Sequence, residues 1–236
     1  MLSIDQSGRK VYTGIDQCGL PVFSKEGLVI TKTFSQLEPS KQQRIINAAL
    51  AEFAEHGYEQ ASTNRIVKKA GIGKGMLFYY FNSKKELYHY LVDYCLNYMT
   101  NNYLSLIDDS EPDFIERYKQ AARIKMKVYA ENPHVFHFLG NILLNQEVEL
   151  PDNLAERLEH IRKLGYSKIY DNIDLTLFRD DVDADKVFNI IRWAMEGYEK
   201  DLLNRLKGQK LSSIDFKPYW DEFYEYLDVL KTSFYK

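Results

Sequence analysis

The chain has 236 residues, of which 45% are hydrophobic, and 31 Lys and Arg stand against 34 Asp and Glu for a formal net charge of −3. This length suits one small and one larger globular domain. Two cysteines, Cys18 and Cys95, exclude a disulfide framework and have no metal-binding spacing. Neither a bilayer-spanning apolar run nor a signal-peptide core occurs, so we expect a cytoplasmic protein without a membrane partner.

Charge is distributed unevenly along the chain. Residues 39–90 carry eight basic and four acidic side chains, a net charge of +4, whereas the chain after residue 90 has a net charge of −7. A basic module joined to an acidic body suits a protein that presents one face to phosphates. A solvated charged surface would give the same composition.

Residues 1–36 contain four glycines and Pro21 and show no sustained hydrophobic period. We predict no helix there and interpret the segment as a flexible leader. Arg9 and Lys10 could form a minor-groove arm, but the even charge balance of this segment argues against it. An alternative is that the natural start lies near Val29 and that the residues before it are not native.

A first helix is predicted from Pro39 to His56. Ile46, Leu50 and Phe53 form its apolar stripe, and Gly57 stands where a helix-terminating glycine belongs.

Two short helices follow across a glycine turn. The first has Thr63 as its expected N-cap and ends at Gly71-Ile72-Gly73, because glycine adopts the left-handed conformation of a tight turn. The second runs from about Lys74 to Phe81. Leu77 and Phe81 point inward, which leaves an outer face of cations and aromatic side chains. Such a pair is typical of a helix-turn-helix that binds DNA.

A long helix is predicted from about Ser83 to Leu104, with Ser83 and Glu86 as a capping box. It begins in the basic module and continues into the body, so it is the expected mechanical link between them. The sequence predicts helices throughout the body as well. They begin after a start signal at Ser110–Asp113 and continue over about 133–145, 151–172, 184–207 and 216–235. The predicted fold class is therefore all-α.

The last two helices carry long apolar stripes. The final one has a heptad seam, made by Phe216, Trp220, Phe223, Leu227, Leu230 and Phe234. The helix before it has a stripe made by Val187, Ile191, Ala194, Tyr198 and Leu202. On residue pattern alone, both stripes would bury against their own chain.

The sequence gives little support for a phosphate-binding loop, a metal site or a catalytic site. The Gly71–Gly75 stretch lacks the spacing and the Ser/Thr of a phosphate-binding loop. His134 and His137 make at most half of a metal site, and no nucleophile elbow or His-Glu-x-x-His motif occurs. We therefore expect neither an enzyme nor a cofactor nor a metal site.

The run from Ala70 to Phe81, followed by Ser83-Lys84-Lys85-Glu86-Leu87, resembles the signature of the TetR family of bacterial transcriptional regulators. The motif match extends from about Ser40 to Tyr90, and helix order extends it more weakly over the rest. The resemblance implies a three-helix DNA-binding domain at 37–85 after the leader at 1–36. It also implies a helical domain at 86–236 for effector binding and dimerisation.

The resemblance implies a homodimer that regulates transcription, most often by repression, on a palindromic operator in double-stranded DNA. The implied DNA contacts are Thr63, Asn64, Arg65, Lys74, Gly75, Met76, Phe78, Tyr79, Tyr80 and Lys84. Thr63, Tyr80 and Lys84 are expected at phosphates, and the residues of the second short helix are expected in the major groove. Met76 and Phe78 depart from the common Thr and Tyr, which puts polar contacts at these positions in doubt.

In this family the last two long helices pair with those of a second subunit. The implied dimer interface is Ile191, Ala194, Tyr198, Trp220, Phe223, Leu227 and Leu230. A small apolar or aromatic effector is expected near Tyr118, Met126, Tyr129, Phe136 and Tyr170, where aromatic residues are dense. The alternative function is a DNA-organising or partner-binding protein of the same fold that has no small-molecule effector.

Overall fold

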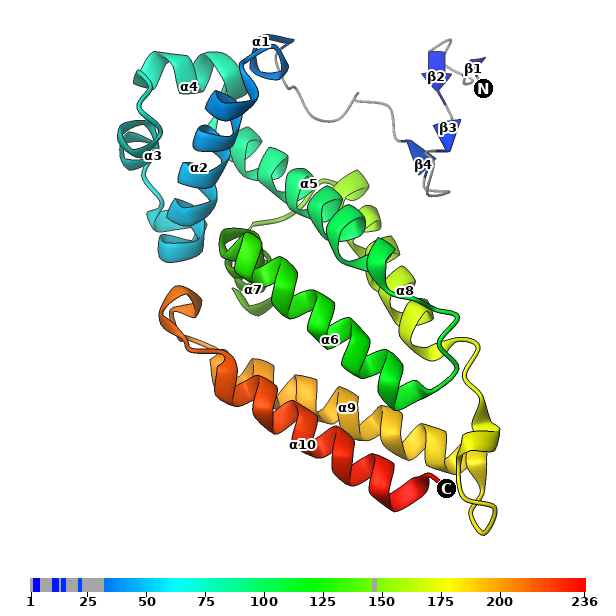
Figure 1. The fold of residues 1–236 in the computed structure, drawn as a ribbon. Helices are drawn as coiled ribbons and strands as arrows, with labels where there is room; N and C mark the ends of the chain where they lie inside the picture. Colours follow the sequence, from blue (N-terminus) through cyan, green and yellow to red (C-terminus); the bar gives the residue numbers. More distant parts are fainter. Residues whose placement is uncertain (1, 5–9, 13, 16–20, 23–31, 146–147) are drawn as a thin grey trace.

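The computed structural model of the chain describes residues 2–4, 10–12, 14–15, 21–22, 32–145 and 148–236 (Figure 1). These residues are mostly helical. In chain order the helices are α1 (Lys32–Ser35), α2 (Pro39–Gln60), α3 (Thr63–Ala70), α4 (Lys74–Phe81), α5 (Lys84–Asn102), α6 (Phe114–Glu131), α7 (Pro133–Asn145), α8 (Asp152–Tyr170), α9 (Ala184–Leu206) and α10 (Lys217–Phe234). Three short 3₁₀ turns are η1 (Leu104–Leu106), η2 (Leu175–Leu177) and η3 (Leu211–Ser213). The predicted all-α class is confirmed.

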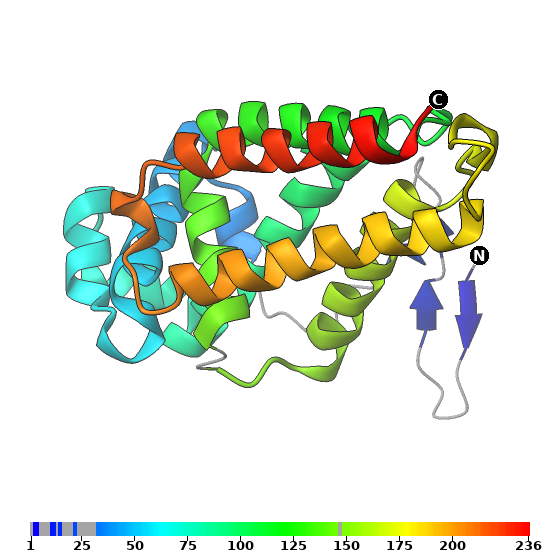
Figure 2. The same ribbon diagram turned by 90° about the horizontal axis from the view of Figure 1, so that it is seen from below.

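Figure 1 shows α2, α3 and α4 as a compact module at one end of the molecule. Helix α5 leads from this module into the body. Helices α6, α7 and α8 lie around α5 and form the body. Helices α9 and α10 form an outer layer on the side away from α5, and Figure 2 shows α10 running beside α6. The long helix expected to join the two parts of the chain is therefore present.

The first 36 residues differ from the prediction. Helix α1 lies within them, where no helix was expected, and the side chain of Phe34 is buried against Tyr80, Phe81 and Tyr90. Helix α1 is too short to show a hydrophobic period in the sequence. Burial of the Phe34 ring explains why it forms. The structure describes no side chain at Arg9, Lys10, Cys18 or Val29. The suggested minor-groove arm and the alternative start near Val29 therefore lie outside what the structure describes.

Among the described residues before α1 there are four short strands. Strand β1 (Leu2–Ile4) pairs antiparallel with β2 (Lys10–Tyr12), and β3 (Gly14–Ile15) pairs antiparallel with β4 (Pro21–Val22).

One continuous core joins the helix-turn-helix module to the body. Buried side chains of α2, α3 and α4, such as Phe53, Ile66 and Leu77, belong to the same cluster as Leu91 of α5 and Phe138 of α7. A module of about fifty residues has a marginal core of its own. Packing against α5 and α7 supplies the apolar burial that it lacks.

A second core lies between α6, α9 and α10, and it decides how the last two helices face. Its fully buried members include Phe114 of α6, Ile191 of α9 and Leu227 of α10. Ile191 and Leu227 therefore pack inside their own chain, and their prediction as dimer-interface residues is wrong. Both helices are apolar on two sides, so the stripe in the sequence did not distinguish the inner side from the outer one.

A buried arginine holds α6 to the end of α8. The guanidinium of Arg117 donates to backbone carbonyl oxygens of Asp109 and Glu111 before α6, and of Asn172 after α8, with distances of 3.0, 2.8 and 3.3 Å. Burial lowers the pKa of Arg117. Carbonyl groups at the C-terminal end of a helix favour a cation, which explains why the charge is tolerated there.

Most predicted helix boundaries hold to within three residues, and the caps show where they do not. Gly57 has a φ of 66° and kinks α2, whose assigned helix continues to Gln60 rather than ending at His56. The N-cap of α3 is Ser62, not Thr63. Ahead of α6 the cap is Asp113, which accepts from the backbone N–H groups of Ile115 and Glu116, so Ser110 is not the start.

Candidate DNA-binding interface

The turn between α3 and α4 requires glycine at one position. Gly71 has a φ of 67° and a ψ of 39°, and its backbone N–H donates to Lys68 O. Ile72 N–H then donates to Val67 O at 3.0 Å, which closes the end of α3. A Cβ at Gly71 would meet no described atom within 4 Å, so backbone conformation rather than space explains the glycine.

Helix α4 presents its outer face to solvent because its inner face is anchored. Leu77 and Phe81 are buried in the module. On the other side Lys74, Gly75, Met76 and Tyr79 are exposed, and Phe78 is half-buried. The five residues expected in the major groove therefore lie at the surface of α4, with Phe78 nearest its edge.

Gly75 has no structural reason to be glycine. A Cβ built there would meet no described atom within 4 Å, and its φ is not in the left-handed region. A helical glycine destabilises the fold relative to alanine. A close approach by a partner is one physical reason to keep such a position without a side chain.

Tyr80 does not belong to the exposed face. Only 1% of the residue is exposed, and its ring lies 5.6 Å from that of Phe34. It is a core residue, so the expectation that Tyr80 contacts a phosphate at the surface is wrong. The run Phe78-Tyr79-Tyr80-Phe81 gives no sign in the sequence of which tyrosine hydroxyl reaches solvent.

A buried carboxylate holds α3 against α2. Glu52, 8% exposed, accepts hydrogen bonds from Ser62 N–H and Arg65 Nε, each at 2.8 Å. Arg65 also donates to Gln60 O at 2.9 Å. Burial opposes ionisation of Glu52, but the hydrogen bonds from Arg65 and Ser62 outweigh it and lower its pKa. Arg65 is thus engaged within the module, in a positioning role that the sequence did not reveal.

The remaining expected contacts surround α3 and the start of α5. Thr63 and Asn64 lie in the first turn of α3, where backbone N–H groups point outward and favour an anion. Lys84 donates to Glu59 O at 3.1 Å, and its ammonium lies 4.7 Å from the centre of the Tyr58 ring. An ammonium has three N–H donors, so these contacts leave room for a phosphate.

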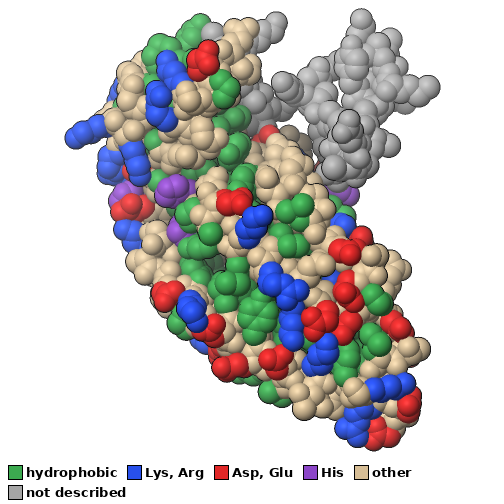
Figure 3. All heavy atoms as spheres, viewed as in Figure 1, with side chains coloured by type: hydrophobic (Ala, Val, Ile, Leu, Met, Phe, Trp, Pro, Cys, Tyr) green, Lys and Arg blue, Asp and Glu red, His purple; other side chains and the backbone are tan. Residues whose placement is uncertain are grey.

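The surface charges match the division seen in the sequence. In Figure 3 Lys and Arg side chains project from the helix-turn-helix module, and Asp and Glu are frequent along the body. An exposed apolar and aromatic helix face within a basic surface fits the major groove, where phosphates position a protein and base edges specify its site.

Comparison with known proteins identifies this module. The family described as "Bacterial regulatory proteins, tetR family" matches residues 45–91, which include the whole helix-turn-helix. The crystal structure of a TetR family transcriptional regulator from Chloroflexus aurantiacus J-10-FL has the same fold, with a TM-score of 0.60 and 22% identity over 87% of this chain and 98% of that one. Residues 45–91 belong to the DNA-binding domain of the TetR family. The chain is a DNA-binding transcriptional regulator.

Two curated relatives are similar over stretches longer than the 45–91 family match. The fatty acid metabolism regulator protein of Bacillus subtilis (strain 168) is 28% identical over 142 residues, 56% of this chain and 66% of that protein. The negative transcriptional regulator IcaR of the biofilm operon icaADBC from Staphylococcus aureus (strain Newman) is 24% identical over 208 residues, 80% of this chain and 97% of that protein.

An exposed apolar face covers the outer side of α9 and α10. Trp193 and Val229 are 60% and 63% exposed, and Ile190 and Tyr226 are exposed beside them. Between the two helices lies a groove of about 340 Å³, lined by Ala194, Met195, Gly197, Tyr198, Asp201, Tyr226, Val229 and Leu230. Of the residues expected at the TetR dimer interface, Ala194, Tyr198 and Leu230 line this groove, and Trp220 and Phe223 are half-buried.

Ile190 and Trp193 were not singled out in the sequence because the stripe of α9 was assigned through Ile191, and Val229 of α10 lies outside the heptad seam assigned to that helix. A second stripe through residues 190, 193, 194 and 197 has equally good helical spacing. Only packing distinguishes the two stripes.

The residues expected around an effector fall into two aromatic clusters. Tyr118 and Tyr170 touch through their hydroxyl groups beside Phe114, and burial raises the pKa of Tyr170 to about 12. Tyr129 instead packs on Phe136, with ring centres 5.6 Å apart. Tyr118 and Tyr129 lie about 16 Å apart along α6 at 1.5 Å per residue.

Met126 is 37% exposed and joins neither cluster, so its assignment to an effector site stays a prediction. It lies on the solvent side of α6, which an apolar residue type does not exclude.

Histidine and acidic side chains make no metal site within the described part of the chain. His137 is buried and bonds Tyr129 through Nε2 at 3.0 Å, and burial and neighbouring His134 lower its pKa. In residues 32–145 and 148–236, none of the helices combines the length and apolar character that a bilayer crossing requires.

Proposed function

We propose that this TetR-family regulator is a homodimeric repressor that inserts α4 of each subunit into the major groove of a palindromic operator. The observation that carries the proposal is the exposed face of α4, where Met76 and Tyr79 stand with Lys74 on an anchored helix. Met76 and Tyr79 are assigned to base edges, since apolar groups contact thymine methyls. Thr63, Asn64 and Lys84 are assigned to phosphates, Lys74 is assigned to the major groove, and Gly75 allows close approach.

We infer that residues 37–85 form the DNA-binding domain, extended at its start by Phe34, and that residues 86–236 form the domain for dimerisation and effector binding. The exposed face of α9 and α10 is the proposed dimer interface. In a two-fold dimer the same patch meets its own copy, and an exposed Trp193 is the kind of residue that dominates such interfaces. Repression is favoured because the relative IcaR is described as a negative regulator.

An apolar or aromatic effector is proposed to bind between α6 and its neighbours, near Tyr118 and Tyr170 or near Tyr129 and Phe136. A relative named for fatty acid metabolism supports an apolar ligand class. Both clusters are closely packed, and a pocket near Phe53, Tyr88 and Phe138 measures only about 10 Å³. Binding would therefore require the aromatic side chains to part.

The effector proposal has a thermodynamic test. A ligand that lowers DNA affinity must itself bind more weakly to the DNA-bound dimer. Calorimetric titration of a candidate ligand, with and without bound DNA, should give a lower affinity in the presence of DNA. Equal affinities for a ligand shown to occupy the body would remove it as the effector.

The closed body also fits a second candidate function, a DNA-organising or partner-binding protein of the same fold without an effector. The two functions differ in where the protein binds. Fragments that the protein retains from its own genome should fall at a few promoters that share one palindrome. Retention of many unrelated fragments would favour the DNA-organising function.

The assignment of contacts can be tested with two variants. Lys84→Ala should weaken binding to every sequence, whereas Met76→Ala should change the preferred sequence. Site selection from random DNA with both variants measures the preferred sequence. Our assignment is wrong if Lys84→Ala alters the preferred site and Met76→Ala does not.

A further inference from the structure

The connection between α9 and α10 packs against the end of α2. In Figure 1 this connection, which contains η3, lies directly beyond the C-terminal end of α2. Lys210 Nζ lies 2.7 Å from Glu55 Oε1 of α2. Leu211, the first residue of η3, is buried. Helix α7 also packs on η3.

A glycine on α7 leaves space for the side chain of Leu211. A Cβ placed on Gly140 of α7 would lie 2.6 Å from Leu211 Cδ1, so Leu211 occupies the space that a side chain at position 140 would need. Beside it Asn141 Nδ2 donates to Ala54 O of α2 at 2.7 Å. Helix α7 therefore holds the connection on one side and the end of α2 on the other.

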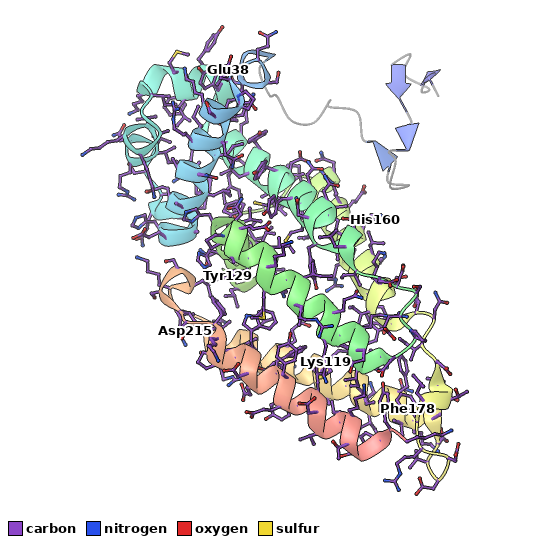
Figure 4. All side chains as sticks on the ribbon, in the orientation of Figure 1. Glu38, Lys119, Tyr129, His160, Phe178 and Asp215 are labelled. Atoms are coloured by element: carbon purple, nitrogen blue, oxygen red, sulfur yellow. The ribbon has the colours of Figure 1, made fainter. Side chains whose placement is uncertain are left out.

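An aromatic contact continues this path toward α10. The ring of Phe216, directly before α10, lies 5.4 Å from that of Tyr129 on α6. Tyr129 in turn bonds His137 of α7. Figure 4 shows Tyr129 at the α7 end of α6 and Asp215 in the turn that precedes α10. Described contacts thus run without a gap from the start of α10 to the end of α2.

We propose that the 207–216 connection is a second link between the dimer face and the DNA-binding domain, parallel to α5, with Lys210 and Leu211 as positioning residues. This inference rests on the proposed function, because it takes α9 and α10 as the dimer helices. The connection joins these helices, so it moves with them. Since it touches Glu55 of α2, and α2 holds α3 through Glu52, the connection fixes the orientation of the helix-turn-helix relative to the dimer face.

The test uses the full chain with a matched charge control. Lys210→Glu places two carboxylates where an ion pair was, whereas Lys207→Glu makes the same charge change at an exposed position of the same connection. Backbone amide exchange of α2, the dimer content from sedimentation, and affinity for the retained genomic fragment are measured for both. A Glu55→Lys/Lys210→Glu double variant restores opposite charges across the contact.

Lys210→Glu is expected to speed exchange in the last turns of α2 and to weaken DNA binding about threefold to tenfold beyond Lys207→Glu, with dimer content unchanged. The double variant should return α2 exchange toward that of the unaltered protein. Equal exchange or equal DNA affinity in Lys210→Glu and Lys207→Glu would overturn the inference. So would a loss of dimer that accounts for the weaker binding. Amide exchange needs no DNA, so failure of the proposed function and failure of this link remain distinguishable.

Discussion

Glu52 shows how a single side chain can decide the geometry of the DNA-binding surface. Its carboxylate satisfies the first free N–H group at the start of α3 and fixes Arg65. Replacing it by alanine leaves the Ser62 N–H without its acceptor. Glu52→Ala should lower the free energy of unfolding by about 1–3 kcal/mol.

Glu59→Ala, at an exposed position near the end of α2, is the control and should change that free energy little. Urea unfolding of both variants measures the difference. Equal stabilities would show that the Glu52 contacts do not hold α3.

His137 should make stability depend on pH. Burial and the neighbouring His134 lower its pKa, so the folded protein disfavours the charged imidazole. A lowered pKa contributes stability that is present above the ordinary value near 6.5, and the contribution is lost as pH falls toward the folded-state value. The free energy of unfolding should therefore fall between about pH 7.5 and 5.5, and it should fall less in His137→Gln.

His160→Gln serves as the control, because His160 is exposed on α8. Denaturant titrations across this pH range would contradict the account if the control and His137→Gln lost stability equally.

At the scale of helices, we predict that replacing Gly75 changes stability and DNA affinity in opposite directions. Alanine at this position of α4 meets no described atom within 4 Å, so Gly75→Ala should stabilise the protein by roughly 0.5–1 kcal/mol. The same methyl group would stand between α4 and the floor of the major groove, so affinity for operator DNA should fall. Thermal unfolding and DNA titration of one variant test both signs, and unchanged or tighter DNA binding would remove Gly75 from the interface.

Helices were predictable where the sequence carries their end signals. Gly71 after α3 and Ser83 before α5 were both expected, and the structure places a left-handed cap at Gly71 and a side-chain hydrogen bond at Ser83. At α6 two acceptors compete, and Asp113 rather than Ser110 makes the cap because it alone stands next to the first helical residue. Local chemistry therefore fixes most helix ends.

The candidate site was predictable only in part, because the direction of a side chain depends on packing between distant segments. The outer face of α4 follows from the spacing of Leu77 and Phe81. The burial of Tyr80 depends on Phe34, which arrives from α1, and the inward direction of Ile191 depends on Phe114 of α6. Neither partner is near in sequence, so periodicity could not show these contacts.

At the scale of the whole molecule, the exposed face of α9 and α10 should decide the oligomeric state. Trp193→Glu places a charge at the centre of the proposed interface, where a desolvated charge without a partner is costly. The dimer should dissociate at least about 30-fold more readily than the unaltered protein. Leu106→Glu, on the exposed η1 turn, is the control. Sedimentation of both variants at micromolar concentration measures the effect, and a Trp193→Glu dimer as stable as the control would exclude this face.

Two-fold symmetry links that face to DNA. A dimer presents two copies of α4, so the half-sites should lie one helical turn apart, roughly 34 Å, or a small multiple of it. Each copy should add phosphate contacts, and affinity should fall by about 0.9 log units per contact for each log unit of salt.

Chemical footprinting of the retained genomic fragment tests the central claim most directly. The account predicts two protected major-groove segments related by a dyad, with both lost in Trp193→Glu and both kept in Leu106→Glu. A single protected segment, or a footprint on the unaltered protein that Trp193→Glu leaves in place, would contradict a dimer that binds its operator through α4.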